Sequence, residues 1–278
     1  MTTYPDLIAT GRAAEPGLVR VQHDGALAIV TLSDRGRLNP LTPGLMVQLR
    51  AALDGADADP AIGQVILTGD GAFSAGGDLE MIENGTRAIR DAAEEADTSD
   101  AWRWIRREFG GVVRTITRSE KLFVAAVDGP AAGVGLAFAL ACDVVLASER
   151  AVLVPAFGRL GLVPEVGTSW RLTRQLGYQG ALAFWLEGRP VGAREALEIG
   201  LVQRVVEPEV LLNEARAWCA RADALPRHVL GLTKPLLRAA ADAPFEHALV
   251  MEEYAEANCF STAALGGAAA AIRTGEAA

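Results

Sequence analysis

The sequence predicts an α/β fold followed by a helical C-terminal segment, and three observations support this prediction. Strand-like, Gly-rich and helical patterns alternate over the first 206 residues. The strand-like runs are short and apolar and are bounded by turn residues. From Pro208 onward the patterns are helical only. Alternation of this kind is typical of helices packed on sheets with right-handed crossovers. We therefore predict an α/β core over residues 1–206 and a helical subdomain over residues 207–278.

The composition predicts a soluble, cytoplasmic protein that binds neither nucleic acid nor membrane. Half of the 278 residues are hydrophobic, which is enough for a sizeable core. The formal net charge of −9 disfavours a nucleic-acid surface. The three cysteines are widely spaced, which fits a reducing compartment. Residues 1–16 hold no apolar run of signal-peptide length, and the richest apolar stretch, 122–147, is too interrupted for a membrane helix.

The first 68 residues indicate a β-hairpin, a helix and a buried strand. The hairpin covers Leu18 to Leu32, and its Asp24-Gly25 pair is a dipeptide that type I′ turns prefer. Thr42-Pro43 then supplies an N-cap and a first-turn proline for the helical segment LMVQLRAALDGA. A short apolar run from Gln64 to Thr68 predicts the next strand.

The middle of the chain carries two Gly-rich loops, each between a strand and a helix. The first loop spans Gly69 to Gly77 and precedes a charged, helical region over Asp78 to Arg118. Within that region we expect the acidic stretch Asp91 to Asp100 to be solvated and mobile. The second loop follows a strand over Phe123 to Val127. Further apolar runs predict a helix and two strands over Leu136 to Ala141, Val144 to Ala147 and Val152 to Val154.

Three helices are expected after Pro208, each opened or preceded by a proline. They cover Pro208 to Ala222, Pro226 to Ala241 and Pro244 to Phe260. The tail, residues 263–278, is rich in alanine and glycine, so we expect it to be loosely held or to depend on a partner surface.

Several common catalytic patterns are absent from the sequence. His23, His228 and His247 stand alone, without the spacing of a metal site. The run Gly133-Val134-Gly135 lacks the third glycine of a dinucleotide fingerprint. The segment Ala72-Phe-Ser-Ala-Gly76 lacks the first glycine of a nucleophile elbow, and no histidine has a suitable context. We therefore expect neither a metal site, nor a Rossmann site, nor a serine-hydrolase triad.

The two Gly-rich loops are the strongest candidates for chemistry. They are GAFSAGGD at 71–78 and DGPAAGVG at 128–135. At the start of the helix that follows each loop, unpaired N–H groups and the helix dipole favour negative oxygen. Such donors stabilise an oxyanion that develops during a reaction. The alternative is that these glycines only form turns or permit close packing.

Longer segments around these loops resemble the enoyl-CoA hydratase/isomerase, or crotonase, superfamily. The similar segments are AFSAGGDLEMI, KLFVAAVDGPAAGVGLAFALACDVVLASERA, FGRLGLVPEVGTSWRLTRQLG and LEGRPVGAREALEIGLVQRVV. The resemblance covers Leu18 to Val206 and implies a spiral of ββα units that binds an acyl-CoA thioester. It also implies an oxyanion hole of two backbone donors, which match Gly77 and Val134 here. Val134 stands where the family has the middle glycine of a Gly-Gly-Gly run, but the donor is its backbone, and its β-branch requires only an ordinary φ.

The carboxylates of this chain favour isomerisation over hydration. The resemblance implies that hydratases of the family use two glutamates, and the matching positions here are Ala137 and Phe157. Both are apolar, and adding water needs one group to activate the water and another to handle the α-proton. Glu165, in a Val-Pro-Glu segment, resembles the single carboxylate of the Δ3,Δ2-enoyl-CoA isomerases. We expect it to open a helix that runs to Gly177 and to move a proton from C2 to C4.

Two opposing effects act on the pKa of Glu165. Apolar neighbours at Phe157, Leu160 and Leu162 would raise it by desolvation, whereas a helix N-terminus would lower it. The alternative role for Glu165 is a helix-opening acid that only complements the dipole. The predicted substrate pocket comprises Ala137, Phe157 and Leu162.

The loop Arg35-Gly-Arg-Leu-Asn-Pro40 resembles the family segment along which the nucleotide part of coenzyme A lies. The predicted coenzyme A contacts are Arg35, Arg37, Ala75, Lys234 and Phe260. The last two would come from the same or a neighbouring subunit. The alternatives are ordinary surface cations and core aromatics, and Trp102 and Trp104 are equally compatible with an acyl pocket and with core packing.

The leading hypothesis is therefore an acyl-CoA isomerase that requires neither a metal nor a redox cofactor, with coenzyme A present as part of the substrate. The alternatives are a hydratase or another enolate reaction, and a non-catalytic acyl-CoA-binding homologue. The resemblance also implies a homotrimer or a dimer of trimers assembled through the C-terminal helices. Asp78 and Asp143 are expected to cap a helix and to satisfy backbone donors.

Overall fold

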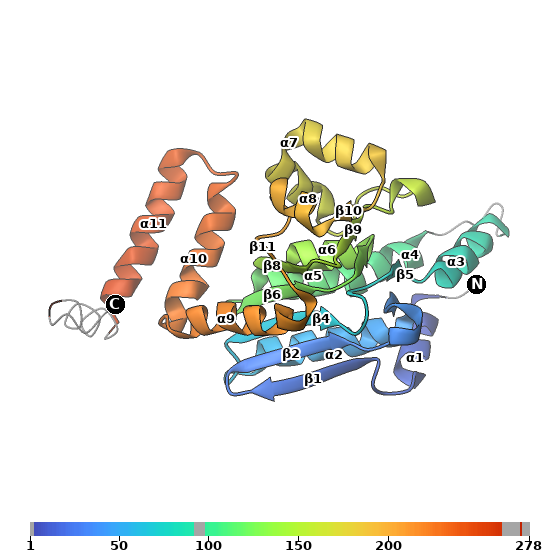
Figure 1. The fold of residues 1–278 in the computed structure, drawn as a ribbon, viewed down its shortest axis with the longest axis horizontal. Helices are drawn as coiled ribbons and strands as arrows, with labels where there is room; N and C mark the ends of the chain where they lie inside the picture. The colour runs from blue at the N-terminus through green and yellow to red at the C-terminus, as the bar shows by residue number, and fades with distance from the viewer. Residues whose placement is uncertain (1–2, 92–97, 263–272, 274–278) are drawn as a thin grey trace.

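A six-stranded sheet forms the centre of the computed structural model, which describes residues 3–91, 98–262 and 273 (Figure 1). Its strands lie in the order β1-β2-β4-β6-β8-β11. β1 is antiparallel to β2, and every later pair of neighbours is parallel. These strands are β1 Val19–Asp24, β2 Leu27–Leu32, β4 Gln64–Gly69, β6 Leu122–Val127, β8 Val144–Ser148 and β11 Arg204–Val206. The predicted hairpin is confirmed, with Gly25 in its turn at a φ of 58°.

Shorter strands follow the long ones and form two smaller sheets. They are β3 Pro40–Leu41, β5 Gly76–Gly77, β7 Pro130–Ala132, β9 Val152–Val154 and β10 Val191–Gly192. β3 pairs with β5, and β9 pairs with both β7 and β10. The order of long strand, short strand and helix therefore repeats in β2-β3-α2, β4-β5-α3, β6-β7-α6 and β8-β9-α7. This repeat is the predicted spiral of ββα units.

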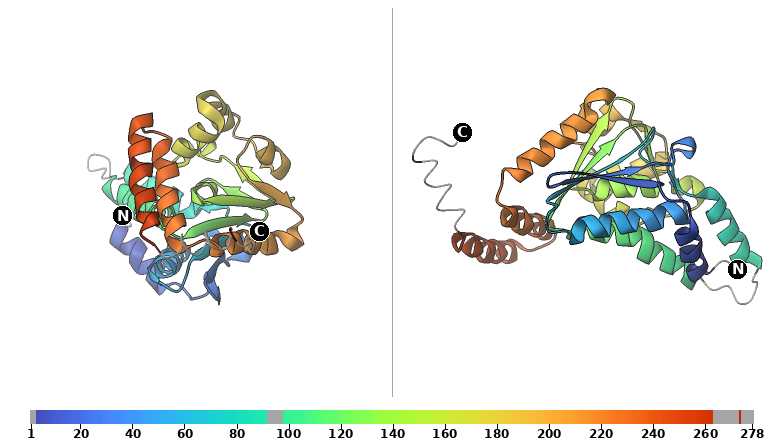
Figure 2. Two further views of the ribbon diagram at one scale, coloured as in Figure 1. Left: turned by 90° about the vertical axis from the view of Figure 1, so that its left-hand side faces the viewer. Right: turned by 90° about the horizontal axis from the view of Figure 1, so that it is seen from below.

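Different helices cover the two faces of the large sheet (Figure 2). Alternate residues of a strand point to opposite faces, so Phe123 of β6 joins the larger hydrophobic core and Val124 joins the smaller one. The larger core is completed by α2 Pro43–Ala58, α5 Gly110–Arg118 and α6 Val134–Ala141, and the smaller core by α9 Leu211–Asp223. Helix α9, the first helix after Pro208, thus packs on the sheet itself.

Helix starts follow the capping signals in the sequence. The Thr42 hydroxyl accepts a hydrogen bond from Leu45 N at 3.2 Å, and Pro43 is the first residue of α2, as predicted. Sequence analysis missed α1, Tyr4–Ala13. Its signal was present, because Thr3 and Asp6 form a capping box around Pro5.

The charged region after the first Gly-rich loop is helical, as expected. It contains α3 Leu79–Asp91, α4 Ser99–Trp104, a five-residue π-helix Ile105–Phe109, and α5. Residues 92–97, the middle of the predicted acidic stretch, lie outside the described residues, so its mobility stays a prediction.

The remaining helices are α7 Thr168–Glu187, α8 Ala193–Glu198, α10 Arg227–Ala240 and α11 Phe245–Phe260. Helix α7 continues past its predicted end through a kink at Gly177. Helices α10 and α11 form a pair that extends away from the sheet (Figures 1 and 2). Within the described part of the chain, no helix has the length and apolar character needed to cross a membrane. The predicted tail over 263–278 falls almost wholly outside the described residues.

Candidate active site

The two Gly-rich loops lie at the same edge of the large sheet. The first follows β4 and the second follows β6, and these two strands are parallel neighbours. Carboxyl ends of neighbouring parallel strands meet at one edge. The topology therefore brings together two loops that are more than 50 residues apart in the sequence.

Backbone contacts join the two loops directly. Ser74 N donates to Pro130 O at 2.9 Å, and Ala132 N donates to Ser74 O at 2.9 Å. Gly76 has a φ of 92°, and a Cβ placed there would lie only 2.7 Å from Ala132 O. Gly76 is thus required both by its backbone conformation and by the close approach of the second loop. The loops therefore touch one residue before Gly77 and two residues before Val134.

The predicted oxyanion donors, Gly77 and Val134, lie where the short strand meets the helix in their ββα units. Gly77 ends β5 directly before Asp78, and Val134 is the first residue of α6. The first N–H groups of a helix have no carbonyl partner within that helix. The Val134 side chain is buried in the larger core, and its φ is not positive, so valine fits this backbone. Binding of an oxyanion here stays a prediction.

Asp78 caps α3, as expected. Its carboxylate accepts a hydrogen bond from Met81 N at 2.9 Å and pairs with Arg37 at 3.0 Å. Arg37 therefore reaches the first Gly-rich loop from the loop at 35–39. That loop is also held by Ala75 N, which donates to Leu38 O at 2.8 Å. Arg35 packs on the backbone of Gly71. The structure thus gathers Arg35, Arg37 and Ala75, all of them exposed, beside the first loop.

The predicted pocket residues differ in exposure. Ala137 and Phe157 are each 2% exposed, whereas Leu162 is 37% exposed. The Phe157 ring approaches Gly133, at 4.0 Å from the position of an added Cβ. Phe157 therefore packs beside the start of α6, and Leu162 lies at the surface in the connection that follows. Whether these side chains contact a substrate stays a prediction.

Glu165 does not open a helix, which corrects the sequence prediction. Helix α7 begins at Thr168, because Val166 and Gly167 have positive φ values of 46° and 89°, outside the range of a right-handed helix. Glu165 lies in the preceding connection, where its carbonyl accepts a hydrogen bond from Thr168 N at 2.9 Å. Its side chain is half-buried and has no hydrogen bond or ion pair with any described residue. Burial raises the pKa of this carboxyl to about 6.

Lys234 lies at the other edge of the sheet, so within one chain it cannot serve the site at the Gly-rich loops. It is 7% exposed, pairs with Asp143 at 2.8 Å, and donates to Lys121 O at the amino end of β6. The six-residue strand separates it from the second loop by about 20 Å. Desolvation lowers the pKa of Lys234, and Asp143 opposes this effect.

Asp143 fulfils its predicted structural role and does more. It accepts a hydrogen bond from Phe123 N at 2.9 Å and pairs with Arg238 at 2.6 Å as well as with Lys234. Phe260, at the end of α11, is 67% exposed and packs into neither core of its own chain. Contacts of Phe260 with coenzyme A therefore stay a prediction.

The two tryptophans after the first loop have different surroundings. Trp104 is buried and meets Phe109 edge to face, and Phe109 meets Phe138 of α6 in the same way. Trp102 is 57% exposed and stacks under Arg106. Core packing therefore accounts for Trp104.

Sequence analysis missed Asn39 and Ser74, both fully buried between the loops. Asn39 Nδ2 donates to Ala72 O at 2.7 Å, and Ser74 Oγ donates to Asn39 O at 2.8 Å. A signal was available for Ser74, which stands among apolar and glycine residues, whereas Asn39 lies in a charged loop and is not distinguished there. A single sequence gives no means of telling such residues from solvated loop residues.

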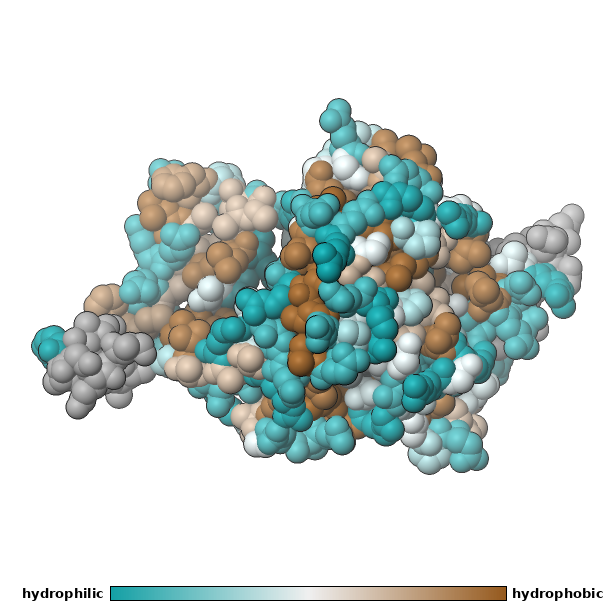
Figure 3. Space-filling model, viewed as in Figure 1, coloured by the Kyte–Doolittle hydropathy of each residue, from teal (hydrophilic) through white to brown (hydrophobic). Residues whose placement is uncertain are grey.

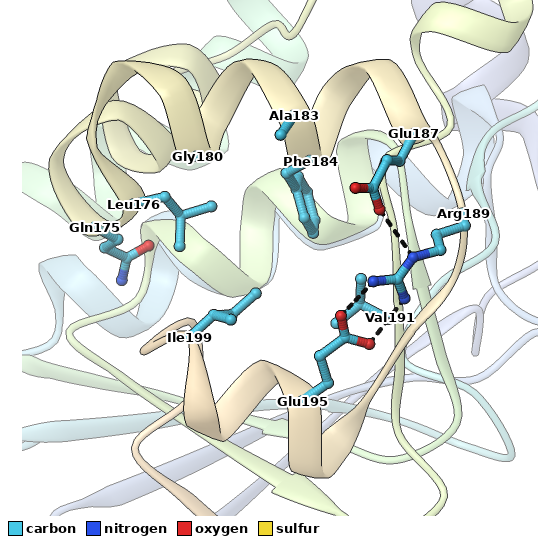
Figure 4. A pocket seen from close by; sticks show the side chains of 10 residues that line it. All are labelled: Gln175, Leu176, Gly180, Ala183, Phe184, Glu187, Arg189, Val191, Glu195 and Ile199. Atoms are coloured by element: carbon cyan, nitrogen blue, oxygen red, sulfur yellow. Dashed lines mark hydrogen bonds and ion pairs between the residues drawn. The ribbon is translucent and has the colours of Figure 1, made fainter.

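A separate surface pocket of 380 Å³ lies between α7 and α8 (Figure 4). Leu176, Phe184, Val191 and Ile199 form its apolar part, and Arg189 at its edge is bound by Glu187 and Glu195. None of the predicted site residues lines this pocket. Among the described residues, no three His, Cys, Asp or Glu side chains lie together as a metal site would require.

Repeating ββα units that carry two backbone-donor loops to one sheet edge define a crotonase-fold protein. The family model for enoyl-CoA hydratase/isomerase matches residues 22–266, and the chain belongs to this family.

Similar proteins extend this assignment over most of the chain. A 4-chlorobenzoyl coenzyme A dehalogenase of Arthrobacter sp. is 31% identical over 78% of this chain and 76% of its own length. A protein of Mycobacterium bovis named "Probable enoyl-CoA hydratase echA8" is 33% identical over 88% of this chain and 90% of its own length. The crystal structure of an enoyl-CoA hydratase from Polaromonas sp. JS666 is 30% identical and superposes with a TM-score of 0.82, covering 92% of this chain and 96% of that one.

Proposed function

We propose that this protein is an acyl-CoA isomerase that converts a 3-enoyl thioester into its 2-enoyl isomer. The observation that carries the proposal is Glu165, a half-buried carboxyl with a pKa of about 6 and without a hydrogen-bonding or ionic partner among the described residues. A structural carboxylate would be expected to have such a partner. A carboxyl that titrates near neutral pH can both accept and return a proton.

The proposed reaction needs one acid/base group and two donors. Ionised Glu165 takes the proton from C2 of the 3-enoyl thioester. The electron pair of that C–H bond then delocalises through the double bond onto the thioester oxygen, giving a dienolate. The N–H groups of Gly77 and Val134 would stabilise the oxygen. Protonated Glu165 then delivers its proton to C4, which leaves the double bond between C2 and C3.

Hydration fits these residues less well. A hydratase needs a second polar group, and the two positions that the family resemblance assigns to glutamates are Ala137 and Phe157. Both are apolar and 2% exposed, so neither side chain can activate a water molecule. The relatives named as hydratases and the one named as a dehalogenase make both reactions the alternatives that an assay must separate.

We also propose how the thioester is held and how the chain assembles. Arg35 and Arg37, exposed beside the first Gly-rich loop, would contact the phosphates of coenzyme A. Lys234 is paired internally, so in this proposal it positions α10 and leaves the nucleotide to other residues. Three copies of the chain would associate through α10 and α11, as a homotrimer or a dimer of trimers. The reaction itself requires neither metal nor redox cofactor.

The test is a panel of thioesters with wild-type protein, Glu165→Gln and the control Glu149→Gln. The panel contains a 3-enoyl-CoA, crotonyl-CoA and 4-chlorobenzoyl-CoA, followed by absorbance and mass. We expect wild type and the control to isomerise the 3-enoyl-CoA, and Glu165→Gln to lose roughly 10²- to 10⁴-fold in rate. Glu149 is a suitable control because it is exposed and pairs only with Arg194 on the surface. Hydration of crotonyl-CoA without isomerisation would sink the proposal.

A further inference from the structure

Ser74 is fully buried in the first Gly-rich loop and uses all of its polar groups. Its backbone N–H and carbonyl bond to Pro130 and Ala132 of the second loop, each at 2.9 Å. Its hydroxyl donates to Asn39 O at 2.8 Å and accepts a hydrogen bond from Gly76 N at 3.1 Å. One residue therefore contacts the loop at 35–39, its own loop and the second loop.

The contact with Gly76 bears directly on the first predicted donor. Gly76 and Gly77 share a peptide bond, and Gly76 has a φ of 92°, where glycine is free to move to other conformations. The Ser74 hydroxyl holds the N–H of Gly76, and the pairing of β5 with β3 holds the same two residues, so both contacts contribute to the placement of the Gly77 N–H.

The second predicted donor is positioned by the same side chain. A Cβ placed at Gly135 would lie 2.7 Å from Ser74 Cβ and 2.9 Å from Ser74 Oγ. The first turn of α6 therefore packs directly against Ser74, and Gly135 has no side chain because Ser74 occupies that space. Val134 directly precedes Gly135. The contact between Gly135 and Ser74 therefore also positions the Val134 N–H.

We infer that Ser74 is a positioning residue that sets the spacing of the Gly77 and Val134 N–H groups. The inference rests on the proposed function, in which these two groups hold the thioester oxygen. Ser74 touches no reacting atom in this role. Without its hydroxyl, the buried N–H of Gly76 loses its contact with Ser74, and the Gly76–Gly77 segment is held only by its pairing with β3.

The test uses a readout that does not depend on turnover. The probe is 4-(dimethylamino)cinnamoyl-CoA, a conjugated thioester whose absorbance moves to longer wavelength when its carbonyl oxygen accepts hydrogen bonds. Titration of the full-length protein gives both the dissociation constant and the red shift of the bound probe. Rates with 3-enoyl-CoA give kcat and KM for the same variants.

The chain offers a closely matched control in Ser119. That serine is also buried, its hydroxyl donates to Asp57 at 2.5 Å, and it accepts a hydrogen bond from the N–H two residues later at 3.1 Å. It lies before β6, at the opposite edge of the sheet from the Gly-rich loops. Ser119→Ala should therefore lower thermal stability to a similar degree as Ser74→Ala without affecting the site.

We expect Ser74→Ala to lose more than half of the red shift and to lower kcat roughly 10- to 100-fold, with KM within about threefold of wild type. Ser74→Cys, which keeps a weak donor and acceptor, should give intermediate values, and it serves as the test if Ser74→Ala does not fold. Ser119→Ala should keep the full shift.

Two results would overturn the inference: a full red shift and full kcat in the Ser74 variants, or the absence of any red shift in wild type. Failure of the proposed function has a different signature. A wild-type shift that falls in Ser74→Ala, without isomerisation of any 3-enoyl-CoA, would support the positioning role of Ser74 and reject Glu165 as the proton shuttle.

Discussion

Glu165 shows how the starting residue of a helix sets the chemistry of a side chain. Had the helix begun at Glu165, its dipole would have lowered the pKa of this carboxyl. The positive φ values at Val166 and Gly167 delay the helix to Thr168, so the carboxyl lies beyond the first turn. Burial then acts without opposition, and the pKa rises to about 6. At neutral pH the carboxyl is therefore mostly ionised, and it is a stronger base than a glutamate with an ordinary pKa.

This pKa predicts the pH profile of the proposed isomerisation. Proton abstraction needs ionised Glu165, and the raised pKa keeps the group protonated up to about pH 6. We therefore expect kcat/KM to rise about tenfold per pH unit below pH 6 and to level off above it. Rates measured from pH 4.5 to 8 check this limb, and circular dichroism over the same range shows whether the protein remains folded. A flat profile through pH 6 would exclude Glu165 as the base.

At the scale of elements, the junction of α10 with the sheet depends on one carboxylate. Asp143 receives Lys234 and Arg238 from α10 and the backbone N–H of Phe123 from β6. Lys234 is 7% exposed, so its charge is largely removed from water, and its partners are this carboxylate, a backbone carbonyl and the Phe123 ring. Breaking a buried pair leaves an uncompensated charge, which costs more than the pair itself contributes.

Asp143→Ala should therefore lower the free energy of unfolding by about 3–5 kcal/mol. Urea denaturation followed by circular dichroism measures the change. Glu149→Ala is the control, because its pair with Arg194 is exposed and should contribute less than about 1 kcal/mol. Equal effects of the two substitutions would show that Lys234 is better solvated than its burial indicates.

At the scale of the whole molecule, the sequence predicted the α/β core well because local signals and topology agree there. Short apolar runs between turn residues marked the long strands, and Thr42-Pro43 marked the start of α2. The two-residue strands β3, β5 and β10 carry too few residues for any periodicity, so they escaped notice. They are strands only because a distant segment lies beside them.

The site was predictable where function resides in the backbone of a recognisable loop, and less so where it depends on long-range contacts. The two Gly-rich loops were identified, and the fold brings them together. Ser74 and Asn39 were not identified, because their partners are 33 or more residues away in the sequence or in a different loop. The position of Lys234 at the opposite edge of the sheet was not predictable, because a helical pattern gives no information on which end of a sheet the helix meets.

Helices α10 and α11 provide the last prediction, which concerns assembly. No residue of the 16-residue helix α11 is buried in a single chain, and Phe245, Tyr254 and Phe260 are 76%, 73% and 67% exposed. Figure 3 shows apolar residues on the surface of α10 and α11, at the left of the view. Large aromatic side chains this exposed on one helix indicate a surface that packs against a partner. We expect analytical ultracentrifugation to give three or six times the chain mass of 29.2 kDa.

Phe245→Asp combined with Tyr254→Asp should give smaller species with less helix by circular dichroism. The control Val21→Asp, on strand β1, should keep the mass and the helix content of wild type. A monomeric wild type at micromolar concentration would contradict assembly through these helices.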